Sequence, residues 1–309
     1  MFSEDRIISD NFSLYYRYET LTGFKSRISP TRLKRAIDSL SKPKKSNEIC
    51  QFCPERIYTD TPVFENNQRI TIGESVTFPN LYPFAKMHVV TVITKEHSPD
   101  RFTKKQISDA LKGQFTALKD KSGYPSINWN NLSSAGASIT HPHMQGISDD
   151  NPAYATGIYI KKSRDYLSKH NENYWEKLRE TEQSSTRYLF GDEIIWSANP
   201  VPLGEKEIRG YLPISSLSEL PGYISRLSSD LLEITEYYRK MGHYAYNLTL
   251  RFDKENSDGA FKAFASIIAR INPNSASASD SAFMERLHLE PVVLTIPEDI
   301  GKIFRNLME

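Results

Sequence analysis

One order of segments occurs twice in this 309-residue chain, and it constrains the fold more strongly than any other feature of the sequence. In each occurrence an Asn is followed by a Pro three residues later, and a strand-like stretch begins eight or nine residues after the Asn. The two occurrences span residues 78–93 and 197–212. Each precedes a helical pattern and two further strand patterns, which predicts an internal duplication of a strand–helix–strand–strand unit.

Apolar residues recur at helical spacing over 98–119, where Ser98 or Thr103 is the start signal, and over 215–241. The predicted strands after these helices are 126–131, 138–145, 246–251 and 263–271. Residues 147–190 are expected to form a linker with a peripheral helix. The predicted fold class is α+β, with two tandem lobes of antiparallel sheet and packed helices, spanning residues 1–150 and 151–309.

The chemistry of the chain is concentrated at His141-Pro142-His143, with Gln145 two residues further on. On an extended segment residues i and i+2 project to the same face, so the two histidines are expected to point the same way. A neutral imidazole attacks phosphorus with one ring nitrogen while the other donates its proton to an acceptor. The alternative is a pair of surface histidines beside a turn. The second copy has no histidine at 269–273, so we expect one active centre, in the first lobe.

The chain has only two cysteines, in the sequence Cys50-Gln51-Phe52-Cys53. Such a pair indicates half of a zinc site, a redox pair or two free thiols. A redox pair usually lies between a strand and a helix, whereas this one follows a Lys-, Ser- and Pro-rich stretch and precedes a turn-like Pro54. Zinc is therefore the favoured interpretation, with histidines as the remaining ligands.

The overall composition excludes several classes of protein. Lys and Arg number 39 against 38 Asp and Glu, so no strong positive field favours nucleic acid or a membrane surface as a partner. No run of apolar residues is long enough for a signal peptide or a membrane span. We expect a soluble, cytoplasmic protein.

Several segments together resemble the galactose-1-phosphate uridylyltransferase-like branch of the histidine-triad (HIT) superfamily. The segments that carry the resemblance are Tyr18–Arg35, Cys50–Pro54, Phe78–Pro83, His88, His97, Asn130 and Gly136–Gln145. The resemblance implies two HIT-like lobes, of which the first is catalytic and contains a zinc site.

The resemblance further implies that Cys50, Cys53, His97 and His141 form a tetrahedral zinc site, with His88 as an alternative to His97. Four protein ligands leave no position for water, so one structural zinc ion per chain is expected.

In the same resemblance His143 is the nucleophile, which forms a nucleotidyl-histidine. Gln145, Ser138 and backbone N–H groups near Gly136 are expected to stabilise the phosphoryl oxygens. The residues expected to contact the nucleotide are Arg32, Arg35, Asn80, Asn130 and Gly136.

The implied activity is that of a hexose-1-phosphate uridylyltransferase-like nucleotidyltransferase, which moves UMP from a nucleotide sugar to a sugar 1-phosphate. The family's C-terminal hexose-contacting motif is altered at Phe283–Glu290, which forms either a different acceptor pocket or an exposed strand face. The alternatives are a phosphorylase of nucleotide sugars or dinucleoside polyphosphates, and a zinc-stabilised nucleotide-binding protein with vestigial catalysis. The family also suggests a homodimer.

Overall fold

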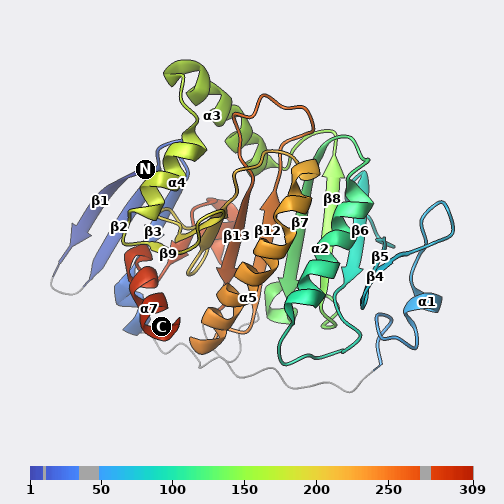
Figure 1. The fold of residues 1–309 in the computed structure, drawn as a ribbon. Helices are drawn as coiled ribbons and strands as arrows, with labels where there is room; N and C mark the ends of the chain where they lie inside the picture. Colours follow the sequence, from blue (N-terminus) through green and yellow to red (C-terminus); the bar gives the residue numbers. More distant parts are fainter. Residues whose placement is uncertain (10–11, 35–48, 272–279, 309) are drawn as a thin grey trace.

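A ten-stranded antiparallel sheet runs through most of the protein (Figure 1). The structure is a computed structural model that describes residues 1–9, 12–34, 49–271 and 280–308. In spatial order the strands are β4 (Ile70–Ile72), β5 (Ser75–Pro79), β6 (Met87–Val92), β8 (His143–Asp149), β7 (Tyr124–Asn131), β12 (Tyr246–Arg251), β13 (Phe264–Ala269), β11 (Ile208–Tyr211), β10 (Ile195–Ala198) and β9 (Tyr188–Phe190).

The order of strands on one side of the sheet centre is matched on the other. Outward from the centre, β7, β8, β6 and β5 correspond to β12, β13, β11 and β10. In each half the third strand leads into a long helix, and the helix leads back to the central strand. The halves meet where β7 pairs with β12, with Trp129 opposite Leu248 and Asn130 opposite Asn247. One sheet therefore joins the two segments in which the sequence order is repeated.

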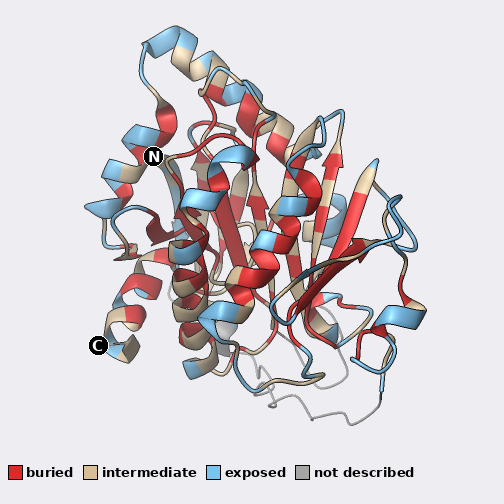
Figure 2. Cartoon of the chain, turned by 45° about the vertical axis from the view of Figure 1, so that its right-hand side comes forward, coloured by how far each residue is buried: buried red, intermediate tan, exposed pale blue. Residues whose placement is uncertain are grey.

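The helices are α1 (Ile57–Asp60), α2 (Lys104–Leu118), α3 (Tyr154–His170), α4 (Tyr174–Gln183), α5 (Ile224–Lys240), α6 (Phe283–Leu287) and α7 (Pro297–Met308). The described residues also form the 3₁₀ turns η1 (Pro30–Lys34), η2 (Ser133–Ala135) and η3 (Leu217–Gly222). Helices α2 and α5 pack side by side against one face of the sheet (Figure 1). Figure 2 shows that both helices are buried toward the sheet and exposed on the opposite side.

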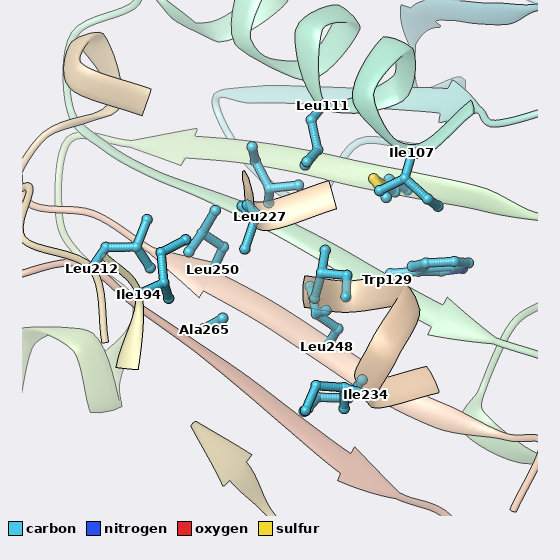
Figure 3. Close-up of a cluster of buried hydrophobic side chains, with 14 of the residues drawn as sticks. Ile107, Leu111, Trp129, Ile194, Leu212, Leu227, Ile234, Leu248, Leu250 and Ala265 are labelled. Atoms are coloured by element: carbon cyan, nitrogen blue, oxygen red, sulfur yellow. The ribbon is translucent and has the colours of Figure 1, made fainter. Parts of the chain in front are cut away.

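The main core lies between these two helices and the sheet (Figure 3). Ile107 and Leu111 of α2 and Leu227 of α5 point toward the strands, where Trp129 and Leu250 are almost completely buried. Because side chains alternate along a strand, the residues between the buried ones face the opposite side of the sheet. On β7, Asn128 and Asn130 therefore lie on the face of the sheet opposite α2.

A small sheet forms next to the C-terminal half and contains β1 (Phe2–Ile8), β2 (Ser13–Glu19), β3 (Lys25–Ile28) and β14 (Val292–Val293). Buried ion pairs attach it to the large sheet, since Arg209 of β11 lies 3.0 Å from Glu19. Arg17 similarly pairs with Glu298 of α7 at 2.9 Å. The pairing of β14 with β3 is parallel, so this sheet is mixed rather than antiparallel.

The predicted elements are largely present, and their bounds differ for identifiable reasons. Helix α2 begins after Thr103, which accepts a hydrogen bond from the Gln106 N–H in a capping box, and not at Ser98. The helix predicted over 215–241 is divided into η3 and α5, with Pro221 inside η3. Residues 147–190 contain two helices, α3 and α4, where one was predicted.

The strand predicted over 138–145 is wrong in its position, because β8 begins at His143 and continues to Asp149. His141 therefore precedes the strand rather than lying on it. Both imidazoles still contact the Phe52 ring, at centroid distances of 6.4 Å for His141 and 5.3 Å for His143. The two side chains lie on the same side, but a turn places them there and not strand alternation.

Within the described residues, no helix has both the length and the apolar composition needed to cross a membrane.

Leu250→Ala tests the packing at the centre of the sheet. Leu250 is 1% exposed, so its truncation is expected to lower the free energy of unfolding by about 2–5 kcal/mol. Leu287→Ala is the matched control, because Leu287 is 79% exposed and its loss should cost about 0.5 kcal/mol or less. Urea denaturation measures both, and equal effects of the two substitutions would contradict this description of the core.

Candidate active site and metal centre

His143 begins β8 and is held in one orientation by its own neighbour. Its Nδ1 lies 2.9 Å from the backbone carbonyl oxygen of His141. A carbonyl only accepts, so Nδ1 carries the proton and Nε2 presents a lone pair. Burial lowers the pKa of His143, and the hydrogen bond to the His141 carbonyl only partly opposes that effect. His143 is therefore a neutral imidazole with an unprotonated Nε2 at pH 7.

A pocket of about 140 Å³ adjoins this imidazole. Four of the predicted site residues line it: His143, Gln145, Ser138 and Asn80. The remaining wall is a mixture of apolar and polar side chains, contributed by Gln51, Phe52, Asp60, Thr61, Pro62, Phe78, Leu81, Tyr82, Val90 and Ile139. Aromatic and aliphatic walls with a few polar groups are typical of small-ligand sites.

Three polar side chains meet beside His143. The His88 Nε2 lies 2.8 Å from Gln145 Oε1 and 3.0 Å from Asn80 Nδ2. His88 is 3% exposed, and its other ring nitrogen lies 3.4 Å from the backbone N–H of Phe84. Burial lowers the pKa of His88, with the Gln145 hydrogen bond acting in the opposite direction. His88 is thus a neutral residue that contacts Gln145 and Asn80, two residues of the pocket lining.

Cys50, Cys53, His97 and His141 form a compact cluster, as the family resemblance implies. One ligand atom of each lies within 4.8 Å of the others, so the residues fit a metal site. The ring of His88, the alternative fourth ligand, is instead occupied by Gln145. Burial raises the pKa of the Cys50 thiol, and a bound cation would supply the charge that a thiolate needs there.

The distances within the cluster fit tetrahedral coordination. Metal–sulfur bonds of about 2.3 Å and metal–nitrogen bonds of about 2.0–2.1 Å give S···S near 3.8 Å and S···N near 3.6 Å about a tetrahedral centre. The two Sγ atoms are 3.8 Å apart, and His141 Nδ1 lies 3.6 and 3.7 Å from them. His97 Nδ1 is 3.4 Å from Cys53 Sγ.

The second nitrogen of each histidine in the cluster is also engaged. The His141 Nε2 donates to the backbone carbonyl of Thr94 at 2.8 Å, which leaves Nδ1 free to coordinate. The His97 Nε2 lies 3.4 Å from the Thr140 hydroxyl. The N–H of Phe52 points at Cys50 Sγ, 3.3 Å away. These contacts orient the ligand atoms inward.

Other predicted residues lie outside the pocket lining. Asn130 accepts a hydrogen bond from the Asn247 Nδ2 at 2.7 Å, and Gly136, at φ +88°, ends η2. Arg32 is exposed on η1, within the segment that follows the small sheet. Arg35 lies outside the described residues.

The second half contacts the turn before the histidine pair. Arg270, in the segment that corresponds to His141–His143, donates to Asn247 Oδ1 at 2.7 Å. Asn247 in turn donates to the Ala135 carbonyl oxygen at 2.8 Å. The second half has no histidine at this place, but it supports the turn from which the active segment begins.

Sequence reasoning did not assign pocket roles to Phe52, Leu81 and Tyr82. Phe52 lies between the two cysteines of the predicted metal site, so its position next to that site could have been predicted from the sequence. Leu81 and Tyr82 follow the predicted Asn80, and both are more than half exposed beside the pocket.

Comparison with known proteins agrees with this fold. No family model matches the chain. An uncharacterised protein of Archaeoglobus fulgidus is 28% identical, over 94% of this chain and 91% of that protein. The ADP-glucose phosphorylase of Arabidopsis thaliana, solved with bound ADP-glucose, has a TM-score of 0.76 at 18% identity, covering 94% of this chain and 97% of that one.

Two other solved structures are similar over nearly the whole chain. A GalT-like protein of Arabidopsis thaliana has a TM-score of 0.72 at 17% identity, covering 94% of this chain and 98% of that one. A uridylyltransferase has a TM-score of 0.71 at 17% identity, covering 95% and 98%. The protein therefore has the α+β fold of these GalT-like and uridylyltransferase structures, as the resemblance seen in the sequence implies.

Metal analysis tests the cluster. The purified protein is expected to contain about one metal ion per chain, and Cys50→Ser and His97→Asn should each lose most of it. Because metal binding is coupled to folding, each substitution should also lower the free energy of unfolding by about 4 kcal/mol or more.

His170→Asn is the matched control for the metal experiment, because His170 is an exposed histidine at the end of α3. Its metal content and stability should equal those of the unmodified protein. A fully folded, metal-free protein would contradict the assignment of the cluster as a metal site.

Proposed function

We propose that the protein transfers a nucleoside monophosphate group, with UMP as the first candidate, from a nucleotide sugar to a sugar 1-phosphate through a covalent intermediate on His143. The observation that carries the proposal is the neutral, buried His143, whose Nδ1 is bound to the His141 carbonyl and which lines a pocket with Gln145 and Ser138. The similarity to solved nucleotide-sugar enzymes supports the same class of reaction.

In the proposed first step the Nε2 lone pair of His143 attacks the α-phosphorus of the nucleotide sugar. An N–P bond forms, and the bond between the α-phosphorus and the oxygen bridging to the β-phosphorus breaks. The sugar 1-phosphate leaves with that electron pair. In the second step a phosphate oxygen of the acceptor attacks the same phosphorus, the N–P bond breaks and the imidazole becomes neutral again.

The other polar groups of the pocket have roles that follow from charge. Negative charge on the non-bridging oxygens increases in the transition state, and fixed donors stabilise it. Gln145 and Ser138 are the proposed donors beside His143, and Asn80 is proposed to bind the nucleotide. Roles for Asn130, Gly136 and Arg32 in nucleotide binding remain part of the proposal, although these residues lie outside the pocket lining.

We propose zinc as the metal of the cluster. Two thiolates and two imidazoles are the donors that zinc prefers, and four protein ligands leave no open position. The ion is then structural: it would fix the Cys50–Cys53 turn and His97 against the segment that begins β8.

Inorganic phosphate is the second candidate acceptor, which would make the enzyme a phosphorylase. The segment Phe283–Glu290, where the family contacts the hexose, supports it. This segment forms the short helix α6 and the residues after it, and not the exposed strand face that was one of the two alternatives. Glu290 pairs with Arg27 at 2.8 Å and Glu285 accepts the N–H of Val292, so neither carboxylate lines the His143 pocket.

An ancestral duplication into lobes 1–150 and 151–309, and a homodimeric assembly, belong to the same proposal. The matched strand order of the two halves supports the duplication.

Labelled UDP-, ADP-, GDP- and CDP-sugars test the proposal. The unmodified protein should form a covalent adduct that survives denaturation at alkaline pH, and His143→Ala should form none. His170→Ala, which removes an exposed histidine, is the control and should retain the adduct. No adduct with any nucleotide sugar, or an adduct in His143→Ala, would contradict the mechanism.

Product analysis then separates the acceptors. If a sugar 1-phosphate is the acceptor, adding glucose 1-phosphate to the isolated adduct yields a new nucleotide sugar, and phosphate releases nothing. If the enzyme is a phosphorylase, inorganic phosphate releases a nucleoside diphosphate instead. Tight nucleotide binding without turnover of either kind would indicate a binding protein.

A further inference from the structure

His88 has no part in the metal cluster, yet it is one of the most buried polar side chains beside the pocket. It lies on β6, directly opposite Ile147 of β8. Val90, the next residue of β6 on the same face, lies directly opposite Gln145. On one face of this strand pair His88 and Gln145 are therefore diagonal neighbours, within reach of each other's side chains.

The contacts of the ring determine its tautomer. The backbone N–H of Phe84 points at Nδ1, 3.4 Å away, and a backbone N–H can only donate. Nδ1 is then the acceptor, and the proton of the neutral ring is on Nε2. That N–H lies 2.8 Å from Gln145 Oε1, which accepts it. The Asn80 Nδ2, 3.0 Å from the same ring nitrogen, is not its hydrogen-bond partner in this tautomer, because both groups are donors.

A carboxamide whose oxygen is fixed has its NH₂ group fixed as well. With Oε1 of Gln145 held by His88, the two N–H donors of Gln145 are directed away from His88. Gln145 and His143 both line the pocket, so a ligand bound beside His143 is within the surroundings of the Gln145 amide. The opposite orientation of the amide would present an oxygen to an anionic substrate.

The segment before His88 holds the ring in place. The Phe84 ring lies against the His88 ring at a centroid distance of 4.2 Å. The Asn80 N–H donates to the His88 carbonyl at 2.8 Å, and Asn80 Oδ1 accepts the N–H of Tyr82 at 2.9 Å. These contacts hold the loop that carries Leu81 and Tyr82 of the pocket wall against His88.

We propose that His88 is a positioning residue, which donates from Nε2 to Gln145 Oε1 and so turns the Gln145 amide N–H groups toward the phosphoryl oxygens of the bound nucleotide. The proposal rests on the proposed function for its catalytic consequence. The hydrogen bond and the tautomer are properties of the protein without substrate and can be measured separately.

The first measurement is ¹⁵N NMR of protein labelled in its histidines, with the His88 signals assigned by their loss in His88→Gln. Nitrogen shifts distinguish the two neutral tautomers. His88 is expected as the Nε2–H tautomer. The Nδ1–H tautomer would overturn the proposal, whether or not the enzyme forms an adduct.

The second measurement is a double-mutant cycle on the single-turnover rate of adduct formation. Gln145→Ala is expected to slow the reaction about 10²–10³-fold, as does loss of a single oxyanion donor. His88→Phe keeps an aromatic ring against Phe84 but removes the donor, and should slow it about tenfold or more. Because His88 acts through Gln145, the double variant should be no slower than Gln145→Ala alone.

His88→Gln distinguishes positioning from a merely structural role, because its amide nitrogen can take the place of Nε2 and donate to Gln145. It should recover most of the rate lost in His88→Phe. The proposal would be overturned if the fold-reductions in rate of the two single substitutions multiplied in the double variant. Equal rates for His88→Phe and His88→Gln would overturn it as well. If the unmodified protein forms no adduct, the proposed function fails, and the NMR tautomer alone decides the role of His88.

Discussion

The hydrogen bond from His143 Nδ1 to the carbonyl oxygen of His141 is the interaction on which the candidate site depends. It sets the tautomer of His143 and leaves Nε2 unprotonated. The residue that supplies the carbonyl also directs its own side chain into the metal cluster, where His141 Nδ1 faces both cysteine sulfurs. A metal ion in the cluster would therefore restrain the backbone that orients the nucleophile. The proposed structural metal and the proposed nucleophile would then act as one unit.

The fold supplies the remainder of that unit from distant parts of the chain. The turn at 50–53, the segment after β6 and the turn before β8 meet in the cluster, and Phe52 contacts both His141 and His143. The second half contributes through Arg270 and Asn247, which hold the turn at η2. Helices α3 and α4 pack against its other face, where Tyr159 and Trp175 contact Phe264 of β13, and the small sheet is attached through the Arg209–Glu19 pair. The pocket beside His143 belongs to the first half.

Much of the fold and part of the candidate site could be predicted from the sequence, because the apolar residues of the helices and strands recur with regular spacing. Strand β12 has the predicted bounds of 246–251, and the Cys50, Cys53, His97 and His141 set lies together as the resemblance implies. The start of β8 was missed, because Pro142 and the turn before it delay regular pairing until His143. The proposed role of His88 was also missed: it was expected only as an alternative to His97 in the metal site, and the pairing of β6 with β8 is what brings it to Gln145. Contacts that depend on the register between two strands cannot be predicted from the local sequence pattern of either strand.

The central claim is that the metal cluster and the reactivity of His143 are coupled. Its most direct test is to titrate a chelator against the folded protein and measure, in each sample, metal content and the yield of nucleotidyl-His143 by mass spectrometry. We expect adduct yield to fall in proportion to metal content, while the chains that retain metal react fully. Full adduct formation in metal-free protein that remains folded by circular dichroism would contradict it.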